Sequence, residues 1–189
     1  MKEMNRREFL TLSGAAVVAL SLAGCGGPST PPAPAVPTGK EAKVLEAINQ
    51  ALEAKKIRTL SYSQEASDYA SRFVSPCVKA DKAEVMMPEE QALAYENDMI
   101  ARLEAINQKY GNSALKVKVL GCSFVLGTES NEIKLTLPYD LNGPDFKDAF
   151  NKIVKRVTED TQLKWLGIYC PTVAGTDYIV IAPLSDRRQ

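Results

Sequence analysis

The sequence predicts an α+β fold: a single, three-layer α-β-α-like domain with an antiparallel sheet. Changes in hydrophobic period support this prediction. Up to Gly111, apolar residues recur at the three- and four-residue spacing of helices, whereas beyond it they alternate with polar residues as in half-buried strands. One further helical stretch and two further strand-like stretches follow. Residues 40–189 are enough for one domain with its own core.

The first part of the domain is predicted to be helical. Residues 40–56 form one helix, because their apolar residues share a face. An extended segment at 57–62 leads into a second helix over 64–74, which Ser61 and Gln64 are expected to start as a capping box.

A third helix and a hairpin come next. The helix begins at Pro88, which suits a first turn, and ends at Gly111, which suits a C-terminal stop. Strands are predicted at 115–119 and 133–137, joined by a turn at 127–131.

The last part contains one helix and two strands. Asp145 is a suitable N-cap for a helix that ends near Glu159. Strands are predicted at 163–170 and 178–182, on either side of a turn at 175–177.

The pattern indicates an internal helix-strand-strand duplication. Segments 88–137 and 145–183 share this element order, and Lys-Val-Leu-Gly at 118–121 matches Lys-Trp-Leu-Gly at 164–167. Two such units would lie around one antiparallel sheet, with helices on a face.

The N-terminus has the pattern of an export signal. Arg6-Arg7-Glu8-Phe9-Leu10 resembles the twin-arginine motif, in which Arg6 and Arg7 are the export signal. An uncharged apolar run follows over 10–23, which is too short to span a bilayer. Leu22-Ala23-Gly24-Cys25 resembles a bacterial lipobox, which implies that residues 1–24 are a signal peptide and that Cys25 is the lipidation site.

The segment after this cysteine is predicted to be a stalk. Residues 25–39 comprise the lipidated Cys25 and a linker with five prolines, which favour extended polyproline II. Because a lipoprotein cysteine carries two or three acyl chains, the resemblance implies stable anchoring. We therefore expect a lipid-anchored protein on the extracytoplasmic side of the cell membrane.

The composition excludes several classes of function. The chain has 23 Lys+Arg against 23 Asp+Glu, whereas nucleic-acid-binding proteins have a basic excess. It has no histidine, which removes His-based nucleophiles, His-zinc sites and haem with an axial His. We expect no cofactor, no metal site and no nucleic-acid partner.

Two regions resemble a known family. The helix Val44-Leu45-Glu46-Ala47-Ile48-Asn49-Gln50-Ala51-Leu52, followed by Leu60-Ser61-Tyr62-Ser63, is similar to the opening of CAP-superfamily (SCP-like) domains. The strands Leu166-Gly167-Ile168 and Tyr178-Ile179-Val180 are similar to their C-terminal end. The resemblance implies an α-β-α sandwich. CAP domains usually carry two histidines and two glutamates in a cleft, so a chain without histidine would be a degenerate member, and no site residue is carried over.

Three cysteines remain besides Cys25. Cys77, Cys122 and Cys170 lie 45 and 48 residues apart and match no short metal motif. Being odd in number, they form at most one disulfide within a chain. Two interpretations stay open: all three are buried reduced thiols, or Cys122 pairs with Cys170, which fall in equivalent strands of the two units.

Few residues are candidates for chemistry. Asp140 and Asp145 lie in a Pro/Gly-rich loop and are the most site-like carboxylates, although Asp145 also serves as an N-cap. Lys116, Lys118 and Lys134 are predicted to share the outward face of one hairpin, as a solvated face or a surface for an acidic partner.

These observations predict a non-catalytic binding or interaction module of the cell envelope, and not an enzyme. Its expected partners are membrane lipid, through the N-terminal acyl chains, and a cell-wall or envelope-protein partner. The alternative is an envelope hydrolase that uses Asp/Glu or Ser/Lys chemistry without histidine.

Overall fold

The computed structural model describes residues 36–109, 116–117, 119–120, 123–126, 132–141 and 143–185. The helices are α2 (Gly39–Ala54), α3 (Gln64–Phe73), α4 (Ser75–Ala80), α5 (Glu89–Lys109) and α6 (Phe146–Glu159). The strands are β1 (Ser61–Tyr62), β2 (Glu84–Pro88), β3 (Lys116–Val117), β4 (Ser123–Leu126), β5 (Glu132–Thr136), β6 (Tyr139–Asp140), β7 (Leu163–Tyr169), β8 (Thr172–Val173) and β9 (Thr176–Ser185). Within these ranges, no helix has both the length and the apolar composition that a bilayer crossing requires. The predicted α+β single domain is confirmed.

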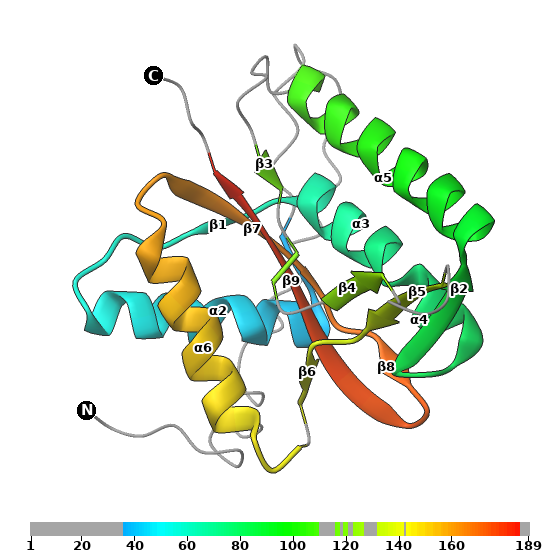
Figure 1. The fold of residues 1–189 in the computed structure, drawn as a ribbon. Helices are drawn as coiled ribbons and strands as arrows, with labels where there is room; N and C mark the ends of the chain where they lie inside the picture. Colours follow the sequence, from blue (N-terminus) through cyan, green and yellow to red (C-terminus); the bar gives the residue numbers. More distant parts are fainter. Residues whose placement is uncertain are drawn as a thin grey trace, which may run out of the picture.

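Strand β9 organises the central sheet. Its partner β7 is antiparallel to it, and β3, β6 and β8 also pair with it antiparallel. The exception to the predicted antiparallel pattern is β1, which pairs parallel to β7. Figure 1 shows β7 and β9 running between α2 and α6 on one side and α3 and α5 on the other.

Alternate residues of β9 enter two different cores, because successive strand side chains point to opposite faces. Ile179 and Ile181 pack with apolar side chains of α2 and α6. Val180, Ala182 and Leu184 pack with those of α3, α4 and α5. This alternation makes β9 the middle of a helix-sheet-helix arrangement.

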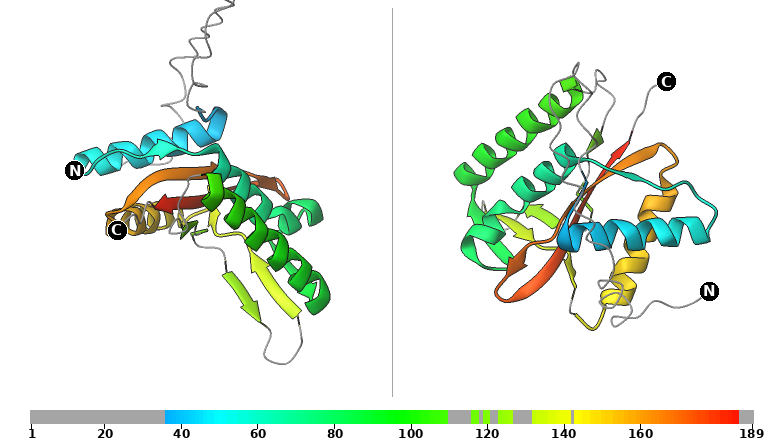
Figure 2. Two further views of the ribbon diagram at one scale, coloured as in Figure 1. Left: turned by 90° about the horizontal axis from the view of Figure 1, so that it is seen from above. Right: turned by 180° about the vertical axis from the view of Figure 1, so that it is seen from behind.

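A second sheet has the order β2-β5-β4. The β4–β5 hairpin projects from the central sheet in the left view of Figure 2. Neither β2 nor β4 was predicted, and both are short. Strand β5 pairs with β4 and β2, so the predicted hairpin between 115–119 and 133–137 is wrong: β3 pairs with β9 instead.

This pairing also corrects the arrangement expected for the two helix-strand-strand units. The strands β7 and β9 of the second unit belong to the central sheet, whereas β4 and β5 of the first unit form the smaller one with β2. Of the described residues of the first unit, β3 and Leu120 reach the central sheet, where both pair with β9. The two units therefore do not form equivalent halves of one sheet.

Local signals at two chain reversals differ from those predicted. Ser63, not Ser61, caps α3, since its hydroxyl accepts a hydrogen bond from the Ala66 N–H. The β8–β9 turn lies at Ala174 and Gly175, whose φ angles of 48° and 76° are those that a tight two-residue hairpin requires.

Candidate functional site

An open groove of about 890 Å³ lies between α3, α4, β2 and α5. Helix α3 contributes one lining residue, Arg72, whereas α4, β2 and α5 each contribute several. The lining side chains used below are Arg72, Lys79, Lys82, Met86, Tyr95 and Asp98.

The connection from α4 to β2 places two lysines in this groove. Pro76 occupies the first turn of α4, where a missing N–H costs no hydrogen bond. Asp81 ends the helix in the left-handed conformation, with φ at 51°, and the Lys82 N–H donates to the Cys77 carbonyl. Lys79 and Lys82 therefore lie on either side of a tight reversal, and both are exposed.

The carboxylate of Asp98 is held by two arginines. Its Oδ2 atom lies 3.0 Å from Nε of Arg102 and 2.7 Å from Nε of Arg72. Hydrogen bonds from Arg102 and Arg72 lower the pKa of Asp98 to about 2. Asp98 therefore stays ionised at neutral pH, as a counter-ion to the guanidinium groups and not as a proton donor.

An ordered aromatic pair and an exposed methionine give the groove its apolar part. The hydroxyl of Tyr95 donates to the Phe73 carbonyl, and the two rings meet edge to face at 6.0 Å. Met86 of β2 has 48% of its surface exposed, whereas its neighbour Met87 is buried. The groove thus combines a fixed ring, an accessible thioether and charged groups.

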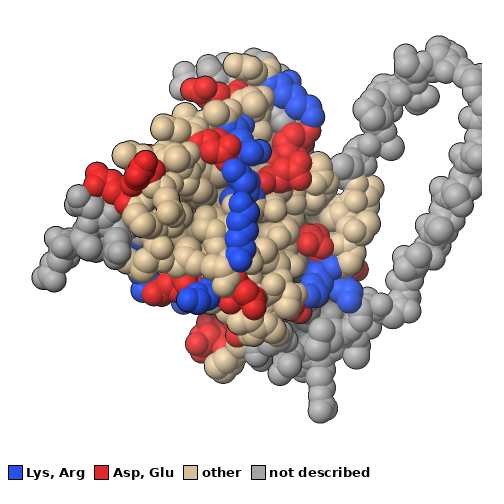
Figure 3. Space-filling model, turned by 90° about the vertical axis from the view of Figure 1, so that its right-hand side faces the viewer, with Lys and Arg blue, Asp and Glu red and all other residues tan. Residues whose placement is uncertain are grey.

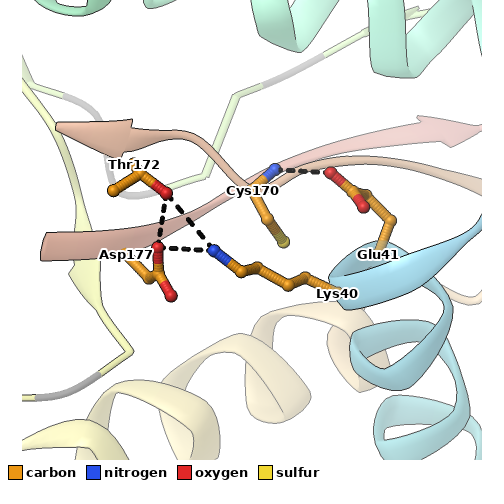
Figure 4. A network of polar contacts seen from close by, with 5 residues as sticks. All are labelled: Lys40, Glu41, Cys170, Thr172 and Asp177. Carbon is orange, nitrogen blue, oxygen red and sulfur yellow. Dashed lines mark hydrogen bonds and ion pairs between the residues drawn. The ribbon is translucent and has the colours of Figure 1, made fainter. Parts of the chain in front are cut away.

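A polar network joins the first turn of α2 to the end of the central sheet (Figure 4). Nζ of Lys40 lies 2.5 Å from Oδ1 of Asp177, which also accepts a 2.6 Å hydrogen bond from the Thr172 hydroxyl. These two hydrogen bonds lower the pKa of Asp177, and the one from Lys40 has the larger effect. Glu41 accepts a hydrogen bond from the Cys170 N–H, at 3.1 Å. The helix that follows the linker is thereby fixed to β8 and β9.

Cys77 and Cys170 carry buried free thiols. Burial raises the pKa of Cys77 to about 11, and burial together with the nearby Glu41 carboxylate raises that of Cys170. Neither sulfur is therefore a thiolate at neutral pH. Cys122 lies outside the described residues, so its pairing with Cys170 stays a prediction.

The other predicted site residues are dispersed. Asp140 is half-buried in β6, while Asp145 is exposed at the N-cap of α6 and makes no side-chain capping bond. Lys116 belongs to β3 of the central sheet and Lys134 to β5 of the smaller one, so the expected common hairpin face is wrong. Nζ of Lys134 lies 2.7 Å from Oε2 of Glu84. Lys118 lies outside the described residues.

The export and lipidation residues also lie outside the described part of the chain. These are Arg6, Arg7 and Cys25, with all of the signal peptide at 1–24 and most of the linker. Over the described ranges, no three His, Cys, Asp or Glu side chains gather as a metal site would require.

A second hollow, of about 460 Å³, lies beside α6 and β6. Two of the basic side chains that line it form ion pairs within α6: Lys155 and Arg156 each lie 3.9 Å from a carboxylate oxygen of Glu159. Exposed ion pairs of this kind contribute little to the stability of the fold. The groove beside β2 is the stronger candidate site.

Sequence reasoning did not identify this groove. The available signal was the short apolar run Val85-Met86-Met87 between Asp81 and Pro88, which is typical of a short strand bounded by turn residues. Three comparisons, with protein-family models, with curated proteins and with solved structures, find no match to this chain.

Proposed function

We propose that this protein is a lipid-anchored, non-catalytic binding module of the cell envelope, which holds a partner in the groove between α3, α4, β2 and α5. The observation that carries this proposal is the groove itself. It is open to solvent, and it offers cations, a fixed Tyr95 ring and the accessible Met86 side chain. Such a mixture suits recognition of a partner that is both charged and apolar.

The charged groups of the groove support binding more than acid-base catalysis. Asp98 is its most perturbed carboxylate, and the two arginines keep it ionised. A general acid or base works best with a pKa near the operating pH, whereas the pKa of Asp98 is displaced away from neutrality. We therefore assign Asp98 a structural role, in which its carboxylate holds the two arginines in place beside the groove.

The anchoring part of the proposal rests on the sequence and on the start of α2. The lipobox-like segment at 22–25 and the proline-rich linker precede Gly39, the first residue of α2. Lys40 and Glu41, in the first turn, are bonded to Asp177 and to the Cys170 backbone. A pull on the linker would thus be applied where the helix is fixed to the sheet.

Native mass spectrometry of the full-length protein tests both parts. The protein would be extracted in mild detergent from a bacterium that processes lipoproteins. We expect a mature chain that begins at Cys25 with added acyl mass, together with a second mass increment from a bound partner. Cys25→Ala should abolish the acyl mass, because the acceptor sulfur is gone.

Ala94→Trp provides the variant for the groove. Ala94 is exposed and lines the groove, so an indole there would occupy the space of the partner. Ala54→Trp, at the exposed end of α2, is the matched control. The partner mass should disappear from the first variant and persist in the second; a chain without any bound mass, or one that keeps it in Ala94→Trp, would contradict the proposal.

A further inference from the structure

Strand β2 is an edge of the smaller sheet, and the direction of its free backbone groups follows from one hydrogen bond. The Leu137 N–H donates to the carbonyl of Ala83 at 2.8 Å, and the β2–β5 register places these two residues opposite each other. In an antiparallel pair, hydrogen-bonded and non-hydrogen-bonded positions alternate. Val85 and Met87 therefore bond to β5, and the N–H and C=O groups of Glu84 and Met86 point to the outer edge.

These outward groups are unpaired within the described part of the chain. Outside the β2–β5 ladder, no hydrogen bond described there involves the backbone of Glu84 or Met86. Both residues are exposed. A row of unpaired N–H and C=O groups on an edge strand is a template for another strand.

The groove runs along this edge. The four consecutive residues 84–87 all line it, although their side chains alternate between the two faces of the sheet. A hollow that touches all four lies beside the strand and not on one face. One strand residue occupies roughly 160 Å³, which is the product of the rise per residue, the distance between neighbouring strands and the distance between packed sheets. A groove of about 890 Å³ thus has room for about five residues of extended chain.

The charge along the groove selects the partner. Asp98 is bound by Arg72 and Arg102, and Glu84 by Lys134. Lys79 and Lys82 have no ion-pair partner among the described residues. Figure 3 shows this side of the molecule, where a stripe of Lys and Arg runs across the surface with Asp and Glu groups beside it. The charge that remains to be neutralised is therefore positive.

We propose that the outer edge of β2 binds an extended acidic peptide segment of an envelope protein as an added strand. The backbone of Glu84 and Met86 would pair with the peptide backbone, Lys79 and Lys82 would bind its carboxylates, and Met86 and Tyr95 would contact its apolar side chains. This inference deepens the proposed function, on which it rests, by naming the class of partner. A second copy of this chain is a poorer occupant, because two facing edges would bring the unpaired lysines of both copies together.

The test measures peptide binding to the full-length lipidated protein in detergent micelles by fluorescence anisotropy. The probe is a labelled nine-residue peptide of alternating Glu and Val, compared with one of alternating Lys and Val. We expect saturable binding of the acidic peptide only, weakened at high salt. The same acidic peptide, N-methylated at every second residue on its pairing edge, should bind at least about tenfold more weakly, because it lacks the donors for β2.

Two protein variants locate the site. Met86→Pro removes one outward N–H and no β2–β5 hydrogen bond, and proline is tolerated on edge strands. The double variant Lys79→Glu/Lys82→Glu reverses the unpaired charge. Each should weaken binding of the acidic peptide at least about tenfold. Lys55→Glu/Lys152→Glu, which makes the same change of net charge at two other exposed lysines, should stay within about twofold of the unmodified protein.

Several outcomes would overturn the inference. One is equal binding of the acidic peptide and its N-methylated form. This comparison changes the peptide and not the protein, so its result does not depend on whether a protein variant folds. Another is concentration-dependent dimerisation, abolished by Met86→Pro, which would assign the edge to a second copy. If no acidic peptide binds while a partner mass is lost in Ala94→Trp, strand addition is wrong and the binding module stands; if neither is seen, both proposals fail.

Discussion

The side-chain amide of Asn49 in α2 bonds to both backbone groups of Leu60, the residue before β1. Its Nδ2 donates to the Leu60 carbonyl at 3.0 Å, and its Oδ1 accepts from the Leu60 N–H at 2.9 Å. The amide thereby takes the place of a neighbouring strand, and it fixes the chain where it leaves the helix and enters the sheet.

We predict that Asn49→Ala lowers the free energy of unfolding by about 1–3 kcal/mol, because it leaves two partly buried backbone groups without partners. Asn49→Asp keeps the acceptor and loses the donor, so it should also be destabilising. Urea denaturation measures both effects. Asn151→Ala, on the exposed side of α6, is the control and should change little; an equal loss in the control would contradict the role of the Asn49 amide.

A second prediction concerns Gly167 of β7, which lies against the backbone of α3. A Cβ at this position would overlap the carbonyl of Ala66 and the amide nitrogen of Ser67. Backbone atoms cannot rotate away as side chains do, so Gly167→Ala should cost about 3 kcal/mol or more. Thermal and urea unfolding would measure this cost.

Gly175→Ala provides the comparison for Gly167. Gly175 has a φ of 76°, yet nothing lies near the position of an added Cβ. Its substitution should cost only about 1 kcal/mol, from the backbone conformation. A smaller loss at Gly167 than at Gly175 would contradict the close approach of α3 to β7 as the reason for glycine at position 167.

A third prediction concerns acid stability. Arg102 and Arg72 hold the pKa of Asp98 at about 2, below the value of about 3.9 for an unfolded chain. A depressed pKa adds stability above pH 4, and this contribution disappears as the pH falls from about 4 towards 2. Asp98→Asn should therefore lower stability at neutral pH and flatten its decline over that interval.

Urea unfolding at a series of pH values measures this dependence. Asp148→Asn, which removes an exposed carboxylate without an ion pair among the described residues, should keep the decline of the unmodified protein. A decline that stays equally steep in Asp98→Asn would show that the pairing with the arginines does not contribute to acid stability.

A fourth prediction concerns thiol reactivity. Burial raises the pKa of Cys77 and of Cys170, so neither should react with maleimide at pH 8 in the folded protein. Both should react after unfolding in denaturant under reducing conditions. Peptide mapping by mass spectrometry locates the label. The same mapping without reductant decides between the two interpretations of the cysteines: a linked peptide containing Cys122 and Cys170 would establish the disulfide, and two separate peptides would establish reduced thiols.

The elements that could be predicted are those whose apolar residues follow the period of the element and lie on the face that the fold buries. Apolar residues on one face of 40–56 and of 146–159 are sufficient to define α2 and α6, because each helix covers the sheet on one side only. Strand β9 was predicted over 178–182 from an apolar run beside a turn, and it extends from Thr176 to Ser185. Helix α4 and strands β2 and β4 span only four to six residues each, too few for a hydrophobic period to distinguish helix from strand.

The groove could not be predicted, because its parts are distant in sequence and individually ordinary. Arg72 lies in the last turn of α3 and Asp98 in the middle of α5, and only the packing of these helices brings their charges to 2.7 Å. The unpaired edge of β2 depends on the choice of β5 as its one partner among the strands that the structure describes. No local pattern encodes that choice.

The sequence by itself determined the fold class, the main helices and the expectation of an anchored, exported protein, since these follow from period, composition and short motifs. The tertiary structure alone decided which strands pair, that β4 and β5 leave the central sheet, and that Lys79 and Lys82 face an open edge. Strand pairing and charge pairing are contacts between distant segments. They depend on which apolar faces the chain buries together, and this is settled only when the whole domain packs.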